Sequence, residues 1–432
     1  MKYHLLFLTL ITSFQAFSAW EGQGEVSFEY RHFEDDNNAQ SQETVPSLFT
    51  RVDTKNDGEI MDMAFRGYGR VSEKESGRNI LRFEDAYVRF PVGFEGDWSL
   101  FAGYKTYNWS ATEAFHPADA VNSRNLDSEF ENFEKMGELT IELEIPILRG
   151  NFSLFYWPRF EAPHFPGASS RLGSGFALDR PRIVSGDDYR EDSQWIHQYG
   201  ARFSNVWGDA DYSLHVLKHI DRNYPLVGDI NYTIVPFGGS SVTVPSKNTL
   251  TPYYFEDTQI GGTLTYVSGA LITKLEYAWR KFEQPIRPVY NALTSQFLLP
   301  KDHQEVALGF EYLIGHESGS ESTLIIEGNT FLGLSDQERR AISVFQRDVL
   351  VGYRFNFNDD MARELFFSAI LDLERSSERF FQLSYSQRLN SFWKAKFALR
   401  VYDAAPENPS LPVGMELFDK DNYLQLTLSR FF

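Results

Sequence analysis

The sequence predicts an all-β protein: a closed antiparallel up-and-down barrel that crosses a membrane with about eighteen strands, sixteen being the alternative count. Three observations lead to this prediction. Apolar and polar residues alternate over many segments of about ten residues, the connections between these segments alternate between short and long, and the last segment is an amphipathic strand that ends in phenylalanine.

The alternation gives each segment two different faces. At 138–145, 211–216, 381–386 and 394–401, apolar residues occupy every second position. Successive side chains of a strand point to opposite sides, so one face of each segment is apolar and the other is polar. A soluble sandwich turns the polar face to bulk water, whereas a membrane barrel turns the apolar face to lipid and the polar face to its lumen. The alternation therefore predicts strands but does not choose between these two folds.

The connections favour the membrane barrel. Every second connection is tight, as at 56–58 and 268–269, while most of the others are long, as at 107–136. Short turns at one end and long loops at the other are typical of outer-membrane barrels. Two connections depart from the rule, because 357–364 is long for a turn and 372–378 is short for a loop. The expected strands are 22–33, 46–55, 59–71, 79–91, 97–106, 137–146, 150–157, 195–204, 209–218, 255–267, 270–281, 303–313, 321–331, 348–356, 365–372, 378–388, 393–402 and 422–432.

The N-terminal segment predicts export. Lys2 is followed by an apolar stretch of about ten residues and then by small residues up to Ala19, which is the order of a secretory signal peptide. The stretch is too short for a membrane-spanning helix, which needs about twenty apolar residues. We expect 1–19 to be a cleaved signal and 20–432 to form the barrel. The 432 residues include no cysteine, so the exported chain forms no disulfide and carries no lipid-anchor cysteine.

Aromatic residues, which make up 16% of the chain, lie near the ends of many expected strands. Girdles of aromatic side chains mark both interfaces of membrane barrels, although a strand-end aromatic also serves as ordinary core packing. The expected girdle residues are Tyr30, Phe90, Trp98, Tyr104, Trp157, Trp195, Trp279 and Trp393.

The last strand carries a further signal. Phe432 ends it, and Leu424, Leu426 and Leu428 share one face. The strand resembles the C-terminal signature of outer-membrane proteins, which the barrel-assembly machinery reads, and this implies that machinery as a partner during biogenesis. Arg430 departs from the signature, which has an aromatic or apolar residue there, but a long arginine side chain can reach the membrane interface.

A second resemblance lies in the segment 107–125, which reads Tyr-Asn-Trp-Ser-Ala-Thr-Glu-Ala-Phe-His-Pro-Ala-Asp-Ala-Val-Asn-Ser-Arg-Asn. It is similar to the Trp-containing, Pro-x-Asp-bearing segment that follows an early strand in porin-like outer-membrane proteins. In architecture, the mature chain resembles their roughly eighteen-stranded substrate-channel and alginate-export-like barrels. The resemblance implies a passive channel for small hydrophilic solutes in outer-membrane lipid, with loop 107–136 folded inward to narrow the pore.

The residue types fit such a constriction. The loop is mainly acidic, and neighbouring strands place basic residues on the predicted lumen face. A basic wall facing an acidic loop creates a transverse field that orients polar solutes. The alternative is a solvated external loop whose acids bind divalent cations or nothing. The candidate constriction residues are Arg66, Arg70, Arg82, Asp85, Arg89, Lys105, Glu113, Asp119, Arg124, Asp127 and Glu129.

The expected strand 79–91 has two conflicting patterns. Leu81 and Phe83 indicate one outward face, whereas Ala86, Val88 and Phe90 indicate the other. A β-bulge, which inserts one extra residue into a strand, shifts the alternation by one position. We therefore predict a bulge at the two acids that separate the patterns, Glu84 and Asp85.

The net charge of -19 lies mainly outside the lumen, because the predicted inward faces carry basic and acidic residues in near-equal numbers. An anionic chain of this kind does not favour nucleic-acid binding. The preference for cations or anions and the oligomeric state stay open.

We expect no catalytic residue, cofactor or metal. None of the nine histidines has the spacing of a metal site, and no nucleophile motif stands in a catalytic setting. Two other functions stay open: a surface barrel whose long loops bind a partner or a polysaccharide, and a barrel enzyme. The proline-rich run 157–166 either stiffens an external loop or forms a lip that grips a ligand.

Overall fold

The computed structural model describes residues 20–432, except 35–41, 94, 130–131, 174, 186–187, 191–193, 224, 229–231, 238, 246–248, 287, 292–295, 376 and 408–413. The expected signal peptide 1–19 lies outside the described residues and stays a prediction.

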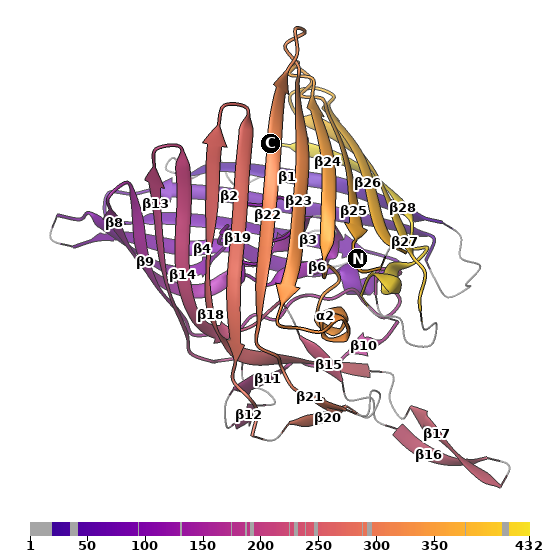
Figure 1. Ribbon diagram of the computed structural model, residues 1–432. Helices are drawn as coiled ribbons and strands as arrows, with labels where there is room; N and C mark the ends of the chain where they lie inside the picture. Colours follow the sequence, from indigo (N-terminus) through magenta and orange to yellow (C-terminus); the bar gives the residue numbers. More distant parts are fainter. Residues whose placement is uncertain are drawn as a thin grey trace, which may run out of the picture.

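Eighteen antiparallel strands form one closed barrel (Figure 1). Each barrel strand pairs with the next one along the chain, and the first also pairs with the last. The count confirms the prediction of eighteen and rules out sixteen. The barrel strands are β1 (Glu21–Phe33), β2 (Thr44–Asp57), β3 (Asp62–Ser72), β4 (Ile80–Val92), β5 (Trp98–Lys105), β8 (Glu138–Ile147), β9 (Gly150–Trp157), β13 (Gln198–Trp207), β14 (Ala210–Ile220), β18 (Thr249–Ser268), β19 (Leu271–Phe282), β22 (His303–Gly315), β23 (Glu321–Leu332), β24 (Asp348–Asn356), β25 (Glu364–Asp372), β26 (Glu378–Arg388), β27 (Trp393–Ala404) and β28 (Tyr423–Phe431).

The seam between β1 and β28 closes the ring. Phe28 lies opposite Leu428 in its register, and Gly24 and Phe432 exchange backbone hydrogen bonds of 2.9 and 3.1 Å. A Cβ atom on Gly24 would lie 2.3 Å from the Phe432 ring, so this close approach requires glycine. A closed sheet pairs the backbone groups of every strand on both sides, as a hydrocarbon environment demands.

The connections sort by length as expected. The turns such as 58–61, 148–149 and 269–270 lie at one end of the barrel, here called the short-turn end. The loops such as 106–137 and 158–197 begin at the other, here called the long-loop end, which is the lower end in Figure 1. This arrangement confirms the parity rule on which the barrel prediction rested.

Side chains also point as the alternation predicts. On β8, Ile141 is 46% exposed on the outer surface, while its neighbours Thr140 and Glu142 are 1% and 3% exposed inside the barrel. The apolar face is thus the outer one and the polar face the inner one, which is the reverse of a soluble sandwich. The predicted bulge in β4 is present, because Arg66 of β3 pairs with Asp85 while the next residue, Gly67, pairs with Phe83.

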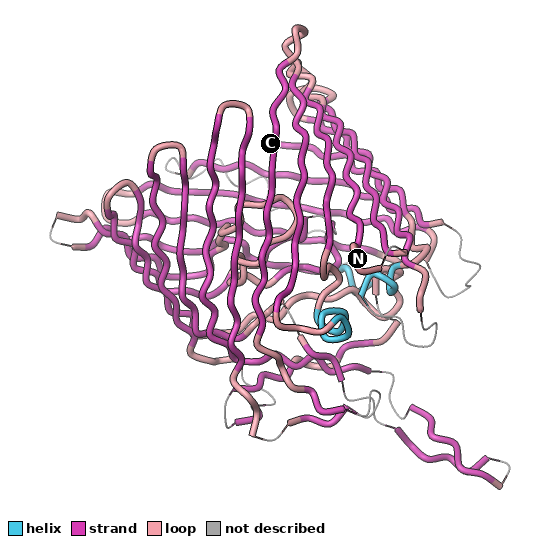
Figure 2. Tube along the Cα trace, viewed as in Figure 1, coloured by secondary structure: helices cyan, strands magenta, loops and turns pink. Residues whose placement is uncertain are grey.

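The long loops carry short elements of their own, and their few helical residues are drawn in cyan in Figure 2. Strand β18 begins earlier than the expected residue 255, because its first residues pair with loop strands instead of barrel neighbours. The loop elements are η2 (Ser76–Arg78), β6 (Arg124–Glu129), β7 (Asn132–Lys135), β10 (Ala177–Leu178), β11 (Arg182–Ser185), β12 (Asp188–Arg190), β15 (Leu226–Gly228), β16 (Tyr232–Phe237), β17 (Ser240–Pro245), β20 (Val289–Asn291), β21 (Gln296–Leu298), α2 (Asp336–Ile342) and η3 (Gly414–Phe418).

One expected girdle residue is wrong. Trp157 is 2% exposed and packs inside the barrel against Leu217, so it belongs to an interior cluster and not to a membrane interface. Strand-end position alone does not tell the inner from the outer face. No helix among the described residues is long and apolar enough to span a membrane.

Candidate functional site

Loop 106–137 leaves β5 and crosses the barrel interior to strands on the other side of the ring. The Glu276 carboxylate on β19 accepts hydrogen bonds from three backbone N–H groups of 111–118, at 2.6 to 3.2 Å. The Glu327 carboxylate on β23 accepts two more, from 113–114, at 2.5 and 2.9 Å. Both carboxylates are buried. We call Glu276 and Glu327 the far-wall seat, because they hold the loop tip against strands on the other side of the ring from β5.

The side chain of Glu113 adds a charged contact at the tip. Its carboxylate lies 3.2 Å from Lys274 Nζ on β19 and 3.2 Å from an Arg354 guanidinium nitrogen on β24. Burial alone would raise the pKa of Glu113, but Lys274 and Arg354 hold it below its ordinary value. The tip is therefore fixed by an anion between two cations.

The returning arm of the loop, β6 and β7, is tied to strands β1 and β3 and to η2 of the β3–β4 connection. Asp127 pairs with Arg78 at 2.9 Å and with Arg31 of β1 at 3.3 Å. Glu134 pairs with Arg70 of β3 at 2.6 Å. Charge-assisted hydrogen bonds of this kind are about twice as strong as neutral ones, so these ion pairs fix the arm in place.

Glu129, at the end of β6, reaches β27. Its carboxylate lies 2.7 Å from Lys396 Nζ and 3.5 Å from Arg400. Burial alone would raise the pKa of Glu129, but these two cations lower it to about 2. The residue therefore stays anionic throughout the range in which an ordinary glutamate begins to protonate.

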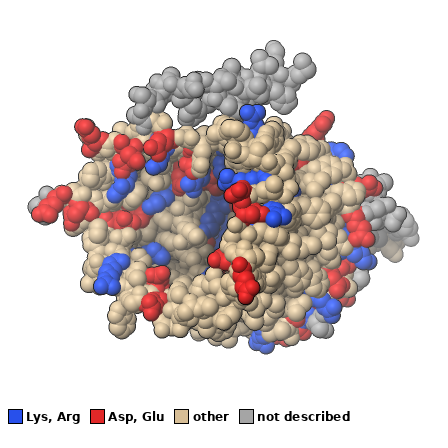
Figure 3. Space-filling model, turned by 90° about the horizontal axis from the view of Figure 1, so that it is seen from above, with Lys and Arg blue, Asp and Glu red and all other residues tan. Residues whose placement is uncertain are grey.

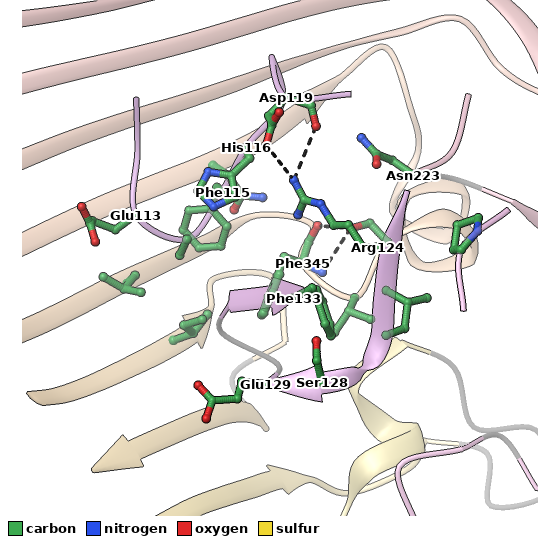
Figure 4. Close-up of a pocket in the computed structure, with 18 of the residues that line it drawn as sticks. Glu113, Phe115, His116, Asp119, Arg124, Ser128, Glu129, Phe133, Asn223 and Phe345 are labelled. Carbon is green, nitrogen blue, oxygen red and sulfur yellow. Dashed lines mark hydrogen bonds and ion pairs between the residues drawn. The ribbon is translucent and has the colours of Figure 1, made fainter. Parts of the chain in front are cut away.

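Within the loop, Asp119 organises the two arms. It is buried, and its carboxylate lies 2.5 Å from Lys135 and 3.3 Å from Arg124. Burial alone would raise its pKa, but Lys135 and Arg124 hold the pKa of Asp119 below its ordinary value. Figure 4 shows Arg124 extending toward Asp119, with Glu129 and Ser128 at the lower end of the same arm.

One side of the interior is filled by this loop. Loop residues pack there against the walls of β9 and β14, and we call this region the filled side. Arg202 of β13 lies 5.3 Å from the Trp109 ring centre, a cation–π distance. The buried cluster consists of Tyr107, Trp109, Val121, Phe155, Trp157 and Leu217.

The other side of the interior is hollow. A cavity of about 1240 Å³, here called the outer cavity, lies between the loop and the wall of β23–β27. Its lining runs from Leu417 at the long-loop end to Glu364 and Lys394, near the short-turn starts of β25 and β27. A second cavity of about 790 Å³, the inner vestibule, lies beside β1–β4 and includes Glu25 and Phe431. Figure 3 looks into the barrel from the short-turn end, where basic side chains lie within a central hollow.

The two cavities adjoin at residues that line both of them, and we call this place the junction. It consists of Asn108, Glu129, Phe133, Lys135, Lys394 and Lys396. Charged residues of both signs line the outer cavity, seven of them basic and five acidic. They are Arg124, Lys135, Arg222, Arg340, Arg354, Lys394 and Lys396, with Glu113, Asp119, Glu129, Glu305 and Glu364.

The candidate bases of β3–β5 lie mainly beside wall acids. Arg66 lies 2.9 Å from Asp53. Arg89 lies 3.0 Å from Asp62, and Lys105 donates to Glu142 at 2.5 Å. These three cations are thus neutralised within the wall instead of facing the loop across a gap. This follows from cross-strand pairing, in which an opposite charge on the next strand is the nearest available partner.

The remaining candidates divide between loop and wall. Arg70 is the expected base that does meet a loop acid, Glu134. Asp85 accepts hydrogen bonds from the N–H and hydroxyl of Thr106, where the loop begins. Arg82 is exposed, and its hydrogen bond goes to the Leu81 carbonyl. The five loop candidates, Glu113, Asp119, Arg124, Asp127 and Glu129, all take part in the ion pairs described above.

Sequence reasoning did not identify the far-wall seat or the lysines of the junction. Glu276 and Glu327 occupy ordinary polar-face positions of their strands, as do Lys394 and Lys396. Alternation placed the lysines of β27 on the polar face, but it could not indicate which strands the loop reaches. Among the described residues there is no group of three or more histidine, aspartate or glutamate side chains that could hold a metal ion.

Comparison with known proteins gives a likeness in fold. No protein-family model matches the chain, and no curated protein matches it. Among solved structures it is similar to three from Pseudomonas aeruginosa. OccK11 (OpdR) has a TM-score of 0.51 at 8% identity and OpdO has 0.50 at 9%, each covering 96% of both chains. OccD3 (OpdP) has 0.50 at 8% identity, covering 96% of this chain and 91% of its own. At these identities the likeness shows the fold.

Proposed function

We propose that the protein is a passive outer-membrane channel for small hydrophilic solutes. The observation that carries this proposal is the pair of adjoining cavities inside a closed barrel whose outer face is apolar. Outer-membrane porins are among the proteins of similar fold, which supports an outer-membrane location and a channel. Outer-membrane lipid, small solutes and, during biogenesis, the barrel-assembly machinery are the proposed partners, and 1–19 is the proposed cleaved signal.

The proposed route runs along one side of the barrel. Solutes enter at the long-loop end, which faces the exterior in barrels of this kind, and pass through the outer cavity. They then pass the junction and leave through the inner vestibule at the short-turn end. Loop 107–136 narrows this route, because it fills the opposite side and supplies Glu129, Phe133 and Lys135 to the junction.

The proposal is tested with purified, refolded protein in a planar bilayer. A channel gives stepwise currents in potassium chloride, and their reduction by neutral sugars of increasing size gives the radius of the passage. Heat-dependent mobility on a gel serves as the control for folding. A correctly folded barrel without stepwise current would contradict the proposal and would favour a surface barrel that acts through its loops.

A further inference from the structure

Half-buried aromatic side chains line the outer cavity. Phe345 belongs to the β23–β24 connection, Phe366 to β25 and Phe418 to η3, while Phe133 and Phe165 come from loops 106–137 and 158–197. The interior of a water-filled barrel is ordinarily polar. Five aromatic rings therefore stand where polar residues would be expected, and because they are not fully packed, core packing alone does not explain them.

Core packing accounts for only some of the nearby apolar residues. Phe115 and Leu172 also line the cavity, but they are 4% and 7% exposed and form part of a buried cluster. The ring of Phe345 rests on Phe115, with 5.5 Å between ring centres. The buried residues thus support half-buried rings such as Phe345, and these rings leave apolar surface exposed to the cavity.

Two of these rings lie close to charge. Arg354 lies 5.2 Å from the Phe366 ring centre and also pairs with Glu113 of the loop tip. Phe133 lines the junction together with Lys394 and Lys396. Figure 4 shows Phe133 and Phe345 among the residues that line the cavity, together with Arg124 and Glu129. An apolar surface flanked by charges of both signs suits a solute with an apolar body and a polar or charged end.

We propose that the outer cavity is a binding site for solutes with an apolar body, such as a ring, and that this binding makes the channel selective. The inference rests on the proposed channel function and names its solute class. Selection acts on the apolar body instead of the sign of charge, because basic and acidic residues line the cavity in similar numbers. The apolar body contacts Phe345 and Phe366, and its charged end remains among the charged residues or water of the passage.

The test compares matched ring-bearing and ring-free ions as inhibitors of the potassium chloride current through single channels. Benzoate is compared with acetate, and benzylammonium with methylammonium. We expect each ring-bearing ion to halve the current at a concentration about tenfold lower than its partner, which corresponds to about 1.4 kcal/mol of extra binding. Equal potency within both pairs would overturn the inference, and a complete absence of current from folded protein would instead overturn the channel function.

Variants on one strand localise the effect. Phe366→Ala should remove most of the preference for ring-bearing ions, whereas Phe367→Ala should leave it unchanged. Phe367 is the matched control, because it is the next residue of β25 and is 40% exposed on the outer surface. Phe345→Ala provides a second lumen variant in case Phe366→Ala does not fold. If the lumen variants that fold keep the full preference, the aromatic residues are not the binding site and the inference is wrong.

Discussion

The two sides of the barrel interior are built from similar residues but differ in packing. On the filled side, Trp109 packs against β9 and β14 and is only 5% exposed, so its cluster leaves no room for a solute. On the hollow side, Phe345 and Phe366 stay half-buried beside the outer cavity. The difference shows that aromatic residues inside this barrel occupy two settings, a packed loop anchor and the lining of a cavity. Which setting applies depends on where the loop is held.

The largest expected effect comes from releasing the loop from its far-wall seat. In the double variant Glu276→Gln/Glu327→Gln, neutral amides replace the carboxylates that accept five backbone N–H groups. The charge-assisted bonds become neutral ones while the Glu113 pairs with Lys274 and Arg354 remain, so we expect the tip to loosen from the wall and the single-channel conductance to rise up to about twofold. Planar-bilayer recording measures this change.

Glu321→Gln is the matched control for that variant. Glu321 lies on β23, like Glu327, but it is exposed at the short-turn end and should not affect the loop. An unchanged conductance in the double variant would show that the seat does not hold the passage narrow. The difference in packing between the filled and hollow sides would then not depend on how the loop tip is anchored.

A smaller effect separates the two kinds of aromatic residue. Trp109→Ala should lower the free energy of unfolding by on the order of 3 kcal/mol, because it leaves a cavity in a packed cluster. Phe345→Ala should cost less than half as much, because part of that ring is already exposed to the outer cavity. Urea-induced unfolding in detergent micelles measures both. Equal losses would mean that the rings of the hollow side are core residues.

The smallest expected effect concerns pH, at the junction between the two sides. The pKa of Glu129 is lowered to about 2 by Lys396 and Arg400, against the effect of burial. Because its pKa is lowered, the ionised Glu129 stabilises the fold fully at any pH above 4.5, the ordinary pKa of glutamate. This stabilisation is lost only as the pH falls toward 2. We therefore expect the ion selectivity set by Glu129 to stay constant between pH 7 and about pH 4.5.

Reversal potentials in a salt gradient measure this selectivity at each pH. Glu129→Gln is the comparison, because it lacks the titrating group. A change in the protein between pH 7 and about pH 4.5 that is absent from Glu129→Gln would show that the ion pair with Lys396 does not form in the open channel.

Much of the fold was predictable because the alternation within each strand indicates which of its residues face the lumen and which face outward. Every expected strand lies at a barrel strand, and even the bulge at Glu84 follows from a local shift in the alternation. Trp157 shows the limit of such local patterns, since a strand-end aromatic residue has the same appearance on either face. The acidic loop residues were identified, but their partners were not. Glu276 and Lys396 look like any polar-face residue until the ring is closed.

The far-wall seat also has a consequence for the order of assembly. Glu276 follows Ala111 by 165 positions, and Glu327 follows Glu113 by 214. Contacts so distant along the chain form slowly, because much of the intervening polypeptide must be arranged first. The loop tip therefore cannot settle in its seat until β19 and β23 have joined the wall, so the narrowing of the interior belongs to a late stage of assembly.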